Sequence, residues 1–230
     1  MQGILLINKP VGWTSFDVVA YVRKIIAGEL KVKPALVKIG HSGTLDPMAK
    51  GLLVLLIGRR YTKQAEKFLK LDKEYSVVMK LGYTSPSIDT ETKEEQVSKD
   101  IPSKDEVMEA LLSFEGAINQ KPPAFSAIKI NGQRAYKLAR SGKEVELESR
   151  PVNIYEIKLI DYNYPTVSFS AKVSSGTYIR SLVLDLGNKL KTGAYMTSLE
   201  RRSIGSFNLT KAIDIEGITF DEVSRHLISD

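Results

Sequence analysis

The apolar residues of this chain recur with two spacings, and the two spacings predict a mixture of helices and strands. The first helix is predicted after Thr14, because Thr14 and Asp17 have the three-residue spacing of a capping box, with Ser15 as the competing cap. Apolar residues then follow helical spacing up to Gly28: Val18, Val19, Val22, Ile25 and Ile26. The next apolar run, 52–57, is short and continuous, which indicates a buried strand.

The same two spacings extend through the rest of the chain. Helices are predicted at 62–71, 103–116, 135–140 and 178–190, and a short terminal helix begins at Thr219; strands are predicted at 75–81, 125–130, 154–160 and 167–173. Residues 83–100 are polar, and we expect a loop there. Helices and strands mix without a regular βαβ alternation. The predicted fold class is therefore α+β, with a mixed, largely antiparallel sheet flanked by helices.

Composition limits the classes of protein to which this chain can belong. Its 33 Lys and Arg against 27 Asp and Glu give a net charge of +6 and a pI near 9.3, which suits a polyanionic partner, although general solubility explains such an excess equally well. The absence of Cys excludes disulfides and fits a reducing cytosol, and two His argue against a structural zinc site. The apolar runs at 4–7 and 52–57 are too short for a signal peptide or a membrane span, so we expect a soluble, cytoplasmic protein.

Residues 40–47 carry the strongest chemical signal in the chain. This segment, Gly-His-Ser-Gly-Thr-Leu-Asp-Pro, places Asp46 in a glycine-bearing loop between two apolar runs, and Pro47 restricts the backbone of Asp46 to extended geometry. The direction of the Asp46 side chain is therefore restricted, as expected for a reactive group. A carboxylate held in this way can attack a sugar or a polarised base and form a covalent intermediate. The alternative is an ordinary turn aspartate before a proline.

This block and four further segments, in the expected order, resemble the TruB family of tRNA pseudouridine synthases. The other segments are GILLINKPVGWTS at 3–15, KEY at 73–75, KPPAFSA at 121–127 and GTYIRSL at 176–182. The resemblance implies a single pseudouridine synthase catalytic domain over residues 1–230, with a central RNA-binding cleft and neither cofactor nor metal. Bacterial members often continue into a C-terminal PUA-type RNA-binding domain, which we expect to be absent here.

The resemblance assigns the catalytic roles to three residues. Asp46 is the expected catalytic aspartate, which lets uracil detach from C1′ and rejoin through C5. Arg180 is its expected ion-pair partner, because a guanidinium can hold a carboxylate in bidentate geometry. Tyr75 is the expected stacking aromatic, whose hydroxyl can also move a proton. Without the resemblance, a phosphate contact for Arg180 and core packing for Tyr75 are the more frequent roles.

Three further residues are expected to bind the target nucleotide. The resemblance places His41 and Tyr178 against the uridine and its neighbours, and Leu199 in the wall of the uracil pocket. A loop histidine is otherwise most often solvated, and a leucine is otherwise ordinary core.

Segment 121–150 carries basic residues interleaved with Phe125 and Tyr136, a composition that suits a folded RNA loop. In the family this segment is a thumb-like loop that closes over the RNA, and we expect it to be mobile without RNA and ordered with it. The expected RNA-binding residues are Lys129, Arg134, Lys137 and Arg140 in this segment and Arg59, Arg60 and Lys63 after the strand at 52–57. The alternative is a solvated, charged hairpin.

The resemblance implies uridine 55 in the T-arm of tRNA as the target, reached by extruding the base from its stack. We expect a monomer that needs no protein partner. Three alternatives remain. One is a related pseudouridine synthase with another target, including the guide-RNA-directed branch, which depends on partner proteins. Another is a non-enzymatic tRNA-binding or folding module in which Asp46 has no role. The third is a glycosylase, which would release the free base.

Overall fold

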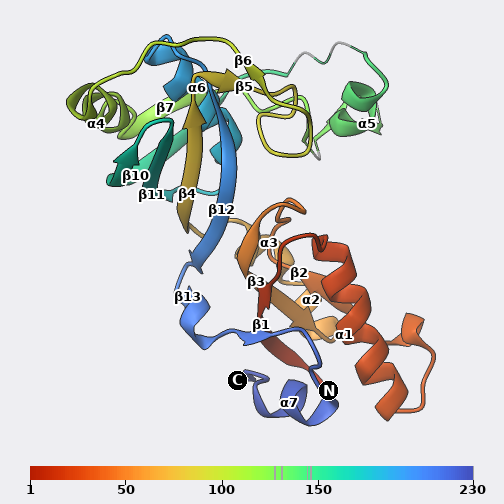
Figure 1. The fold of residues 1–230 in the computed structure, drawn as a ribbon. Helices are drawn as coiled ribbons and strands as arrows, with labels where there is room; N and C mark the ends of the chain where they lie inside the picture. The colour runs from red at the N-terminus through yellow and green to blue at the C-terminus, as the bar shows by residue number, and fades with distance from the viewer. Residues whose placement is uncertain (127, 131, 144, 146, 230) are drawn as a thin grey trace. The chain divides into compact units, whose positions relative to one another are not determined.

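The computed structural model describes residues 1–229 except 127, 131, 144 and 146. The chain divides into two compact units (Figure 1): Met1–Ser76 with Leu199–Asp230, called here unit 1, and Val77–Ser198, called unit 2. The chain passes from one unit to the other twice, within strand β4 (Lys73–Leu81) and within strand β12 (Ala194–Ile204). That the two units act as one catalytic domain stays a prediction.

Unit 1 is built on a mixed sheet. Strand β1 (Gly3–Lys9) pairs antiparallel with β3 (Lys50–Ile57) and parallel with the short β14 (Ile213–Asp214). Strand β3 also pairs with β2 (Ile39–His41) and with β12, on which β13 (Phe207–Asn208) forms a short antiparallel partner. The strand predicted at 52–57 is confirmed as the central part of β3.

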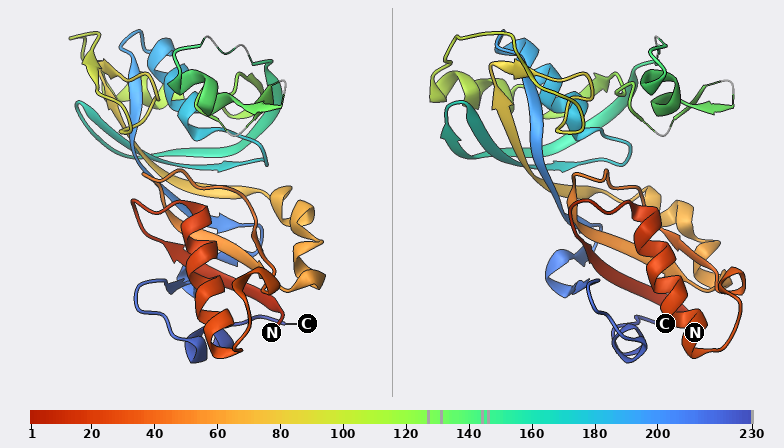
Figure 2. Two further views of the ribbon diagram at one scale, coloured as in Figure 1. Left: turned by 90° about the vertical axis from the view of Figure 1, so that its right-hand side faces the viewer. Right: turned by 45° about the vertical axis from the view of Figure 1, so that its right-hand side comes forward.

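Helices cover both faces of this sheet, which explains why β1 and β3 are apolar at nearly every position. Helix α1 (Ser15–Glu29) and the terminal helix α7 (Phe220–Arg225) share one core cluster with side chains such as Leu5 and Leu53. Figure 2 shows α1 along one face of the strands, with the two chain ends near each other. The ends are joined by a bridge in which Ile4 and Ile228 exchange two 2.8 Å backbone hydrogen bonds.

The opposite face is covered by α2 (Arg59–Thr62) and α3 (Ala65–Leu69), whose Tyr61 and Phe68 pack on Leu6 and Val54. The prediction of one helix at 62–71 is wrong, because Gln64 leaves helical geometry (φ −97°, ψ 6°) and divides the segment in two. Two short 3-10 helices, η1 (Pro34–Leu36) and η2 (Leu209–Lys211), complete unit 1.

The strands of unit 2 follow the order β12-β4-β11-β10-β7. The antiparallel pair β10 (Arg150–Asn163) and β11 (Thr166–Val173) confirms the two strands predicted there, and β7 (Gly116–Gln120) adds to the edge of β10. Helices α4 (Lys104–Leu112) and α6 (Ile179–Lys189) confirm two further predictions. The mixed, largely antiparallel sheet with flanking helices confirms the α+β fold class.

Two predictions in unit 2 need correction. Residues 83–100 are not only loop, because β5 (Tyr83–Thr84) and β6 (Glu95–Gln96) form a two-stranded sheet. The strand predicted at 125–130 is reduced to β8 (Lys129–Ile130), which pairs with β9 (Gln133–Arg134) ahead of α5 (Ala135–Arg140), the helix predicted at 135–140. No helix in the described part of the chain combines the length and the apolar character needed to span a bilayer.

Candidate active site

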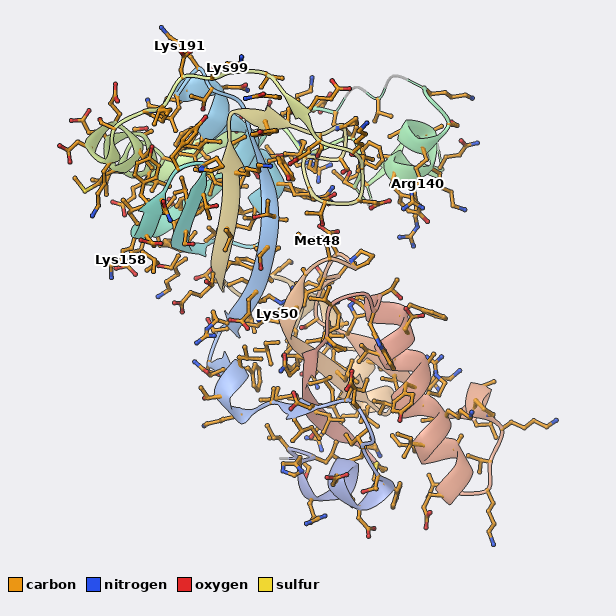
Figure 3. The ribbon with its side chains drawn as sticks, viewed as in Figure 1. Met48, Lys50, Lys99, Arg140, Lys158 and Lys191 are labelled. Carbon is orange, nitrogen blue, oxygen red and sulfur yellow. The ribbon has the colours of Figure 1, made fainter. Side chains whose placement is uncertain are left out.

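The loop between β2 and β3 presents Asp46 on a backbone that is anchored on both sides. The Ser15 hydroxyl accepts a hydrogen bond from the Leu45 amide (2.9 Å) and donates one to the Leu45 carbonyl (3.3 Å). The Pro47 carbonyl accepts from the Gly12 amide (2.8 Å). The residues immediately before and after Asp46 are therefore tied to the start of α1 and to the loop that precedes it. Asp46 itself is half-buried, and Figure 3 labels Met48 farther along the same loop.

A buried lysine lies beneath this loop. Lys9 is fully buried at the end of β1, and its ammonium donates to three backbone carbonyls, those of Pro10 (2.8 Å), Trp13 (2.6 Å) and Pro47 (3.5 Å). Burial lowers the pKa of Lys9 to about 8, while the negative charge of Asp46 acts in the opposite direction. Lys9 therefore links the loop between β1 and α1 to Pro47, and its positive charge attracts the Asp46 carboxylate. Its only signal in the sequence was its place in the opening motif, and no role was predicted for it.

A buried arginine from β12 holds the first half of the same loop. Arg201 is 1% exposed; its Nε donates to the Leu52 carbonyl (2.8 Å) and its guanidinium also donates to the Gly43 carbonyl (3.1 Å). Arg201 thus links the loop to β3, although it lies 158 residues from Gly43 in the sequence. No role was predicted for Arg201, and its burial is unusual because charged side chains are mostly exposed.

His41 is the last residue of β2 and lies near the positive charge of Arg201. Its Nδ1 accepts a hydrogen bond from the Gly43 amide (3.3 Å), so the neutral ring carries its proton on Nε2. Burial lowers the pKa of His41 below 6.5, and the positive charge of Arg201 lowers it further. At neutral pH the side chain is therefore an uncharged donor through Nε2, which suits a contact with a nucleotide.

Titration of His41 tests this arrangement. In ¹H–¹⁵N spectra we expect its pKa below 6.5, and we expect Arg201→Gln to move that pKa upward, because a nearby positive charge is removed. The unfolded chain, with a pKa near 6.5, binds the proton more readily than the folded chain. The free energy of unfolding therefore falls as pH drops below about 6.5. A His41 pKa above 6.5 in the folded chain would contradict the assignment.

The other two unit 1 residues predicted for the site are buried. Tyr75 is the third residue of β4 and is 7% exposed, and Leu199 in β12 is 6% exposed. Lys73, two residues before Tyr75, is also buried and closes the end of α3 by donating to the Leu69 (2.8 Å) and Leu71 (2.6 Å) carbonyls. The roles of Tyr75 and Leu199 in binding uridine stay predictions.

In unit 2, α6 presents Arg180 in a buried ion pair that was not predicted. Its guanidinium lies 3.6 Å from the Asp89 carboxylate, and both side chains are almost fully buried. It also donates to the carbonyls of Ser87 (3.2 Å) and Phe125 (2.8 Å). Because Asp46 and Arg180 belong to different units, the pair predicted between them stays a prediction.

Tyr178 is the N-cap residue of α6, and both of its backbone polar groups are hydrogen-bonded to the buried side-chain amide of Gln120. Gln120 accepts from the Tyr178 amide (2.8 Å) and donates to its carbonyl (3.0 Å), while the Ser181 hydroxyl donates to the Lys121 carbonyl (2.7 Å). The structure therefore brings together two of the sequence motifs, 121–127 and 176–182, in the part that it describes. Residue 127 lies outside the described residues.

The expected RNA-binding residues are exposed where the structure describes them. Arg59, Arg60 and Lys63 lie on and just after α2, and Arg134 and Lys137 lie on β9 and α5. Arg140, labelled in Figure 3, forms an ion pair with Glu91. The side chain of Lys129 lies outside the described parts. The role of all seven residues in binding RNA, and the closure of segment 121–150, stay predictions.

Comparison with known proteins identifies relatives over the whole chain. A family model described as "TruB family pseudouridylate synthase (N terminal domain)" matches residues 29–179. The chain is 44% identical over 229 residues to "tRNA pseudouridine synthase B" of Clostridium novyi (strain NT), covering 100% of this chain and 76% of the relative. It is also 44% identical over 213 residues to the protein of the same name from Chlamydia felis (strain Fe/C-56), covering 93% of this chain and 87% of the relative.

The fold of this chain is shared with solved structures. The chain matches one from "Crystal Structure of a Cbf5-Nop10-Gar1 Complex" at 30% identity and a TM-score of 0.69, over 92% of this chain and 52% of that one. It matches another from "Structure of H/ACA RNP bound to a substrate RNA containing 2'-deoxyuridine" at 28% identity and a TM-score of 0.66, over 93% and 51%. The chain thus spans about half the length of these solved chains.

Proposed function

This chain belongs to the TruB family of tRNA pseudouridine synthases, and we propose that it isomerises uridine 55 in the T-arm of tRNA, with Asp46 as the catalytic carboxylate. The anchored Asp46 loop is the observation that carries the proposal. Leu45 and Pro47 are fixed through their backbones, so the backbone of Asp46 is held between two anchored neighbours. Such preorganisation is what a reacting group needs, because a displacement of about 1 Å can cost on the order of 100-fold in rate.

The chemistry requires one carboxylate and no redox partner. In the isomerisation the bond from C1′ to N1 of uracil breaks and a bond from C1′ to C5 forms, while C5 loses a proton and N1 gains one. Asp46 can serve by attack on C1′, by attack on C6, or by taking a proton in a glycal route. Each route uses the ionised carboxylate, which the buried Lys9 ammonium attracts.

The uridine must leave its stack before the carboxylate can reach it. Extrusion costs a few kcal/mol, which contacts to the flipped base and to flanking phosphates offset. Within unit 1, His41 offers an Nε2 donor at the end of β2, immediately before the loop that carries Asp46. In unit 2, we propose that Tyr178 and Arg180 complete the nucleotide site. The exposed cations on α2 and α5 are the proposed phosphate contacts.

Modification of a bare T-arm hairpin tests the target. We expect the purified chain, without a protein partner or guide RNA, to convert uridine 55 both in an unmodified tRNA transcript and in the isolated hairpin. Pseudouridine is mapped by base-specific chemistry, and a transcript with cytidine at position 55 is the control. Modification at another uridine would overturn the proposed position. Tight binding without modification would indicate a folding module, and free uracil would indicate a glycosylase.

A further inference from the structure

Two apolar side chains are exposed beside the Asp46 loop. Val11, in the loop between β1 and α1, is 60% exposed, and Phe16, in the first turn of α1, is 68% exposed. No other Phe, Tyr or Trp among the described residues is as exposed as Phe16. An aromatic ring carries a large apolar area, so the fold gains little from leaving it in water.

The packing of α1 does not use this ring. Val18, Val19, Val22 and Ile26 face the sheet and form the core cluster, to which Phe16 does not contribute. Phe16 is nevertheless well placed, because the Thr14–Asp17 capping box fixes the first turn of the helix on either side of it. The ring is therefore held outward from a rigid element rather than from a flexible loop.

Hydrogen bonds hold the segment that carries Val11 and Phe16 against the Asp46 loop. Ser15, which precedes Phe16, is bonded to both backbone groups of Leu45, which precedes Asp46. Gly12, which follows Val11, is bonded to Pro47, which follows Asp46. The segment 11–16 thus runs alongside the segment 45–47, and all of these residues belong to unit 1.

We propose that Phe16, supported by Val11, is a stacking platform for an unpaired base of the RNA substrate next to the flipped uridine. This inference rests on the proposed function, because it requires an RNA loop to approach Asp46. A base fits this position better than a phosphate does. The Asp17 carboxylate beside Phe16 would repel a phosphate, whereas the neutral face of a base gains about 1–3 kcal/mol from an aromatic ring.

Four variants test the platform through the affinity for the T-arm hairpin. Phe16→Ala is expected to raise Kd and KM about 5- to 150-fold, which corresponds to the energy of one stacked base. Phe16→Trp is expected to bind like the parent chain, and Phe16→Leu to bind almost as weakly as Phe16→Ala, because Leu keeps apolar area but has no ring. The control is Leu36→Ala, which removes an equally exposed apolar side chain from η1 in the same unit and is expected to change neither constant.

Thermal melting separates a binding role from a structural one. We expect the melting temperature of Phe16→Ala to stay within about 2 °C of the parent chain, since Phe16 lies outside the core. The proposal fails if Phe16→Ala binds the hairpin as tightly as the parent chain, or if Phe16→Leu does. It also fails if Leu36→Ala weakens binding as much as Phe16→Ala.

The outcome does not depend on where the chain modifies its substrate. If the parent chain binds the hairpin but modifies no uridine 55, the proposed function fails while the Kd series still tests stacking. If the parent chain modifies uridine 55 and the Phe16 series has no effect, only the platform fails. A parent chain that does not bind the hairpin overturns both.

Discussion

Replacement of Asp46 by Asn is expected to lower pseudouridine formation by on the order of 10⁴-fold or more, without loss of the fold or of tRNA binding. The amide has nearly the shape of the carboxylate but no negative charge, so it can neither attack the sugar or base nor take a proton. The substitution keeps the backbone groups of Leu45 and Pro47 that anchor the loop to Ser15 and Gly12. The measurement is single-turnover modification of a tRNA transcript, together with the Kd for the same RNA.

Two further variants serve as comparisons for Asp46→Asn. Asp46→Glu keeps the charge but moves it by one methylene, and we expect most of the activity to be lost, because position as well as charge matters. Glu216→Gln removes an exposed acid from the same unit and is expected to leave the rate unchanged. An Asp46→Asn protein that keeps a tenth or more of the parent rate would exclude Asp46 as the catalytic carboxylate.

Replacement of Asp89 by Asn is expected to produce the largest loss of stability among the changes considered for unit 2. The Asp89 carboxylate lies 3.6 Å from the Arg180 guanidinium, and the two side chains are 2% and 7% exposed. Removal of one member of a buried ion pair leaves the other charge buried without its opposite charge. This lowers the free energy of unfolding by about 3 kcal/mol or more. For a chain of this size the melting temperature should fall by about 6–12 °C.

Glu91→Gln is the matched control, because Glu91 belongs to the same loop but pairs with Arg140 at the surface. An exposed ion pair contributes about 0–1 kcal/mol, so this variant should melt within about 3 °C of the parent chain. Calorimetry of the three proteins at one pH and salt concentration is sufficient. Equal melting temperatures for Asp89→Asn and Glu91→Gln would show that the buried pair does not stabilise unit 2. Since Asp89 holds Arg180 in place, we also expect slower modification by Asp89→Asn.

Local features of the chain were predictable because their causes are local. Three helix starts have both halves of a capping box within four residues, at Thr14, Ser103 and Thr219, and all three boxes are present in the structure. The alternation in 75–81 predicted β4 for the same reason. In contrast, β7 has little apolar alternation and exists because β10 supplies its hydrogen-bonding partner. A strand of this kind cannot be predicted from its own residues.

The candidate site divides in the same way. Sequence alone singled out Asp46, because glycines, a histidine and an Asp-Pro pair are adjacent in the chain, and it also identified the family. It did not indicate that Lys9 and Arg201 are buried, since charged side chains are seldom buried without partners. Their partners are backbone carbonyls, which every residue carries and which therefore leave no trace in a sequence. The carbonyls bound by Arg201 belong to residues about 150 positions away, and only the tertiary structure brings them within hydrogen-bond distance.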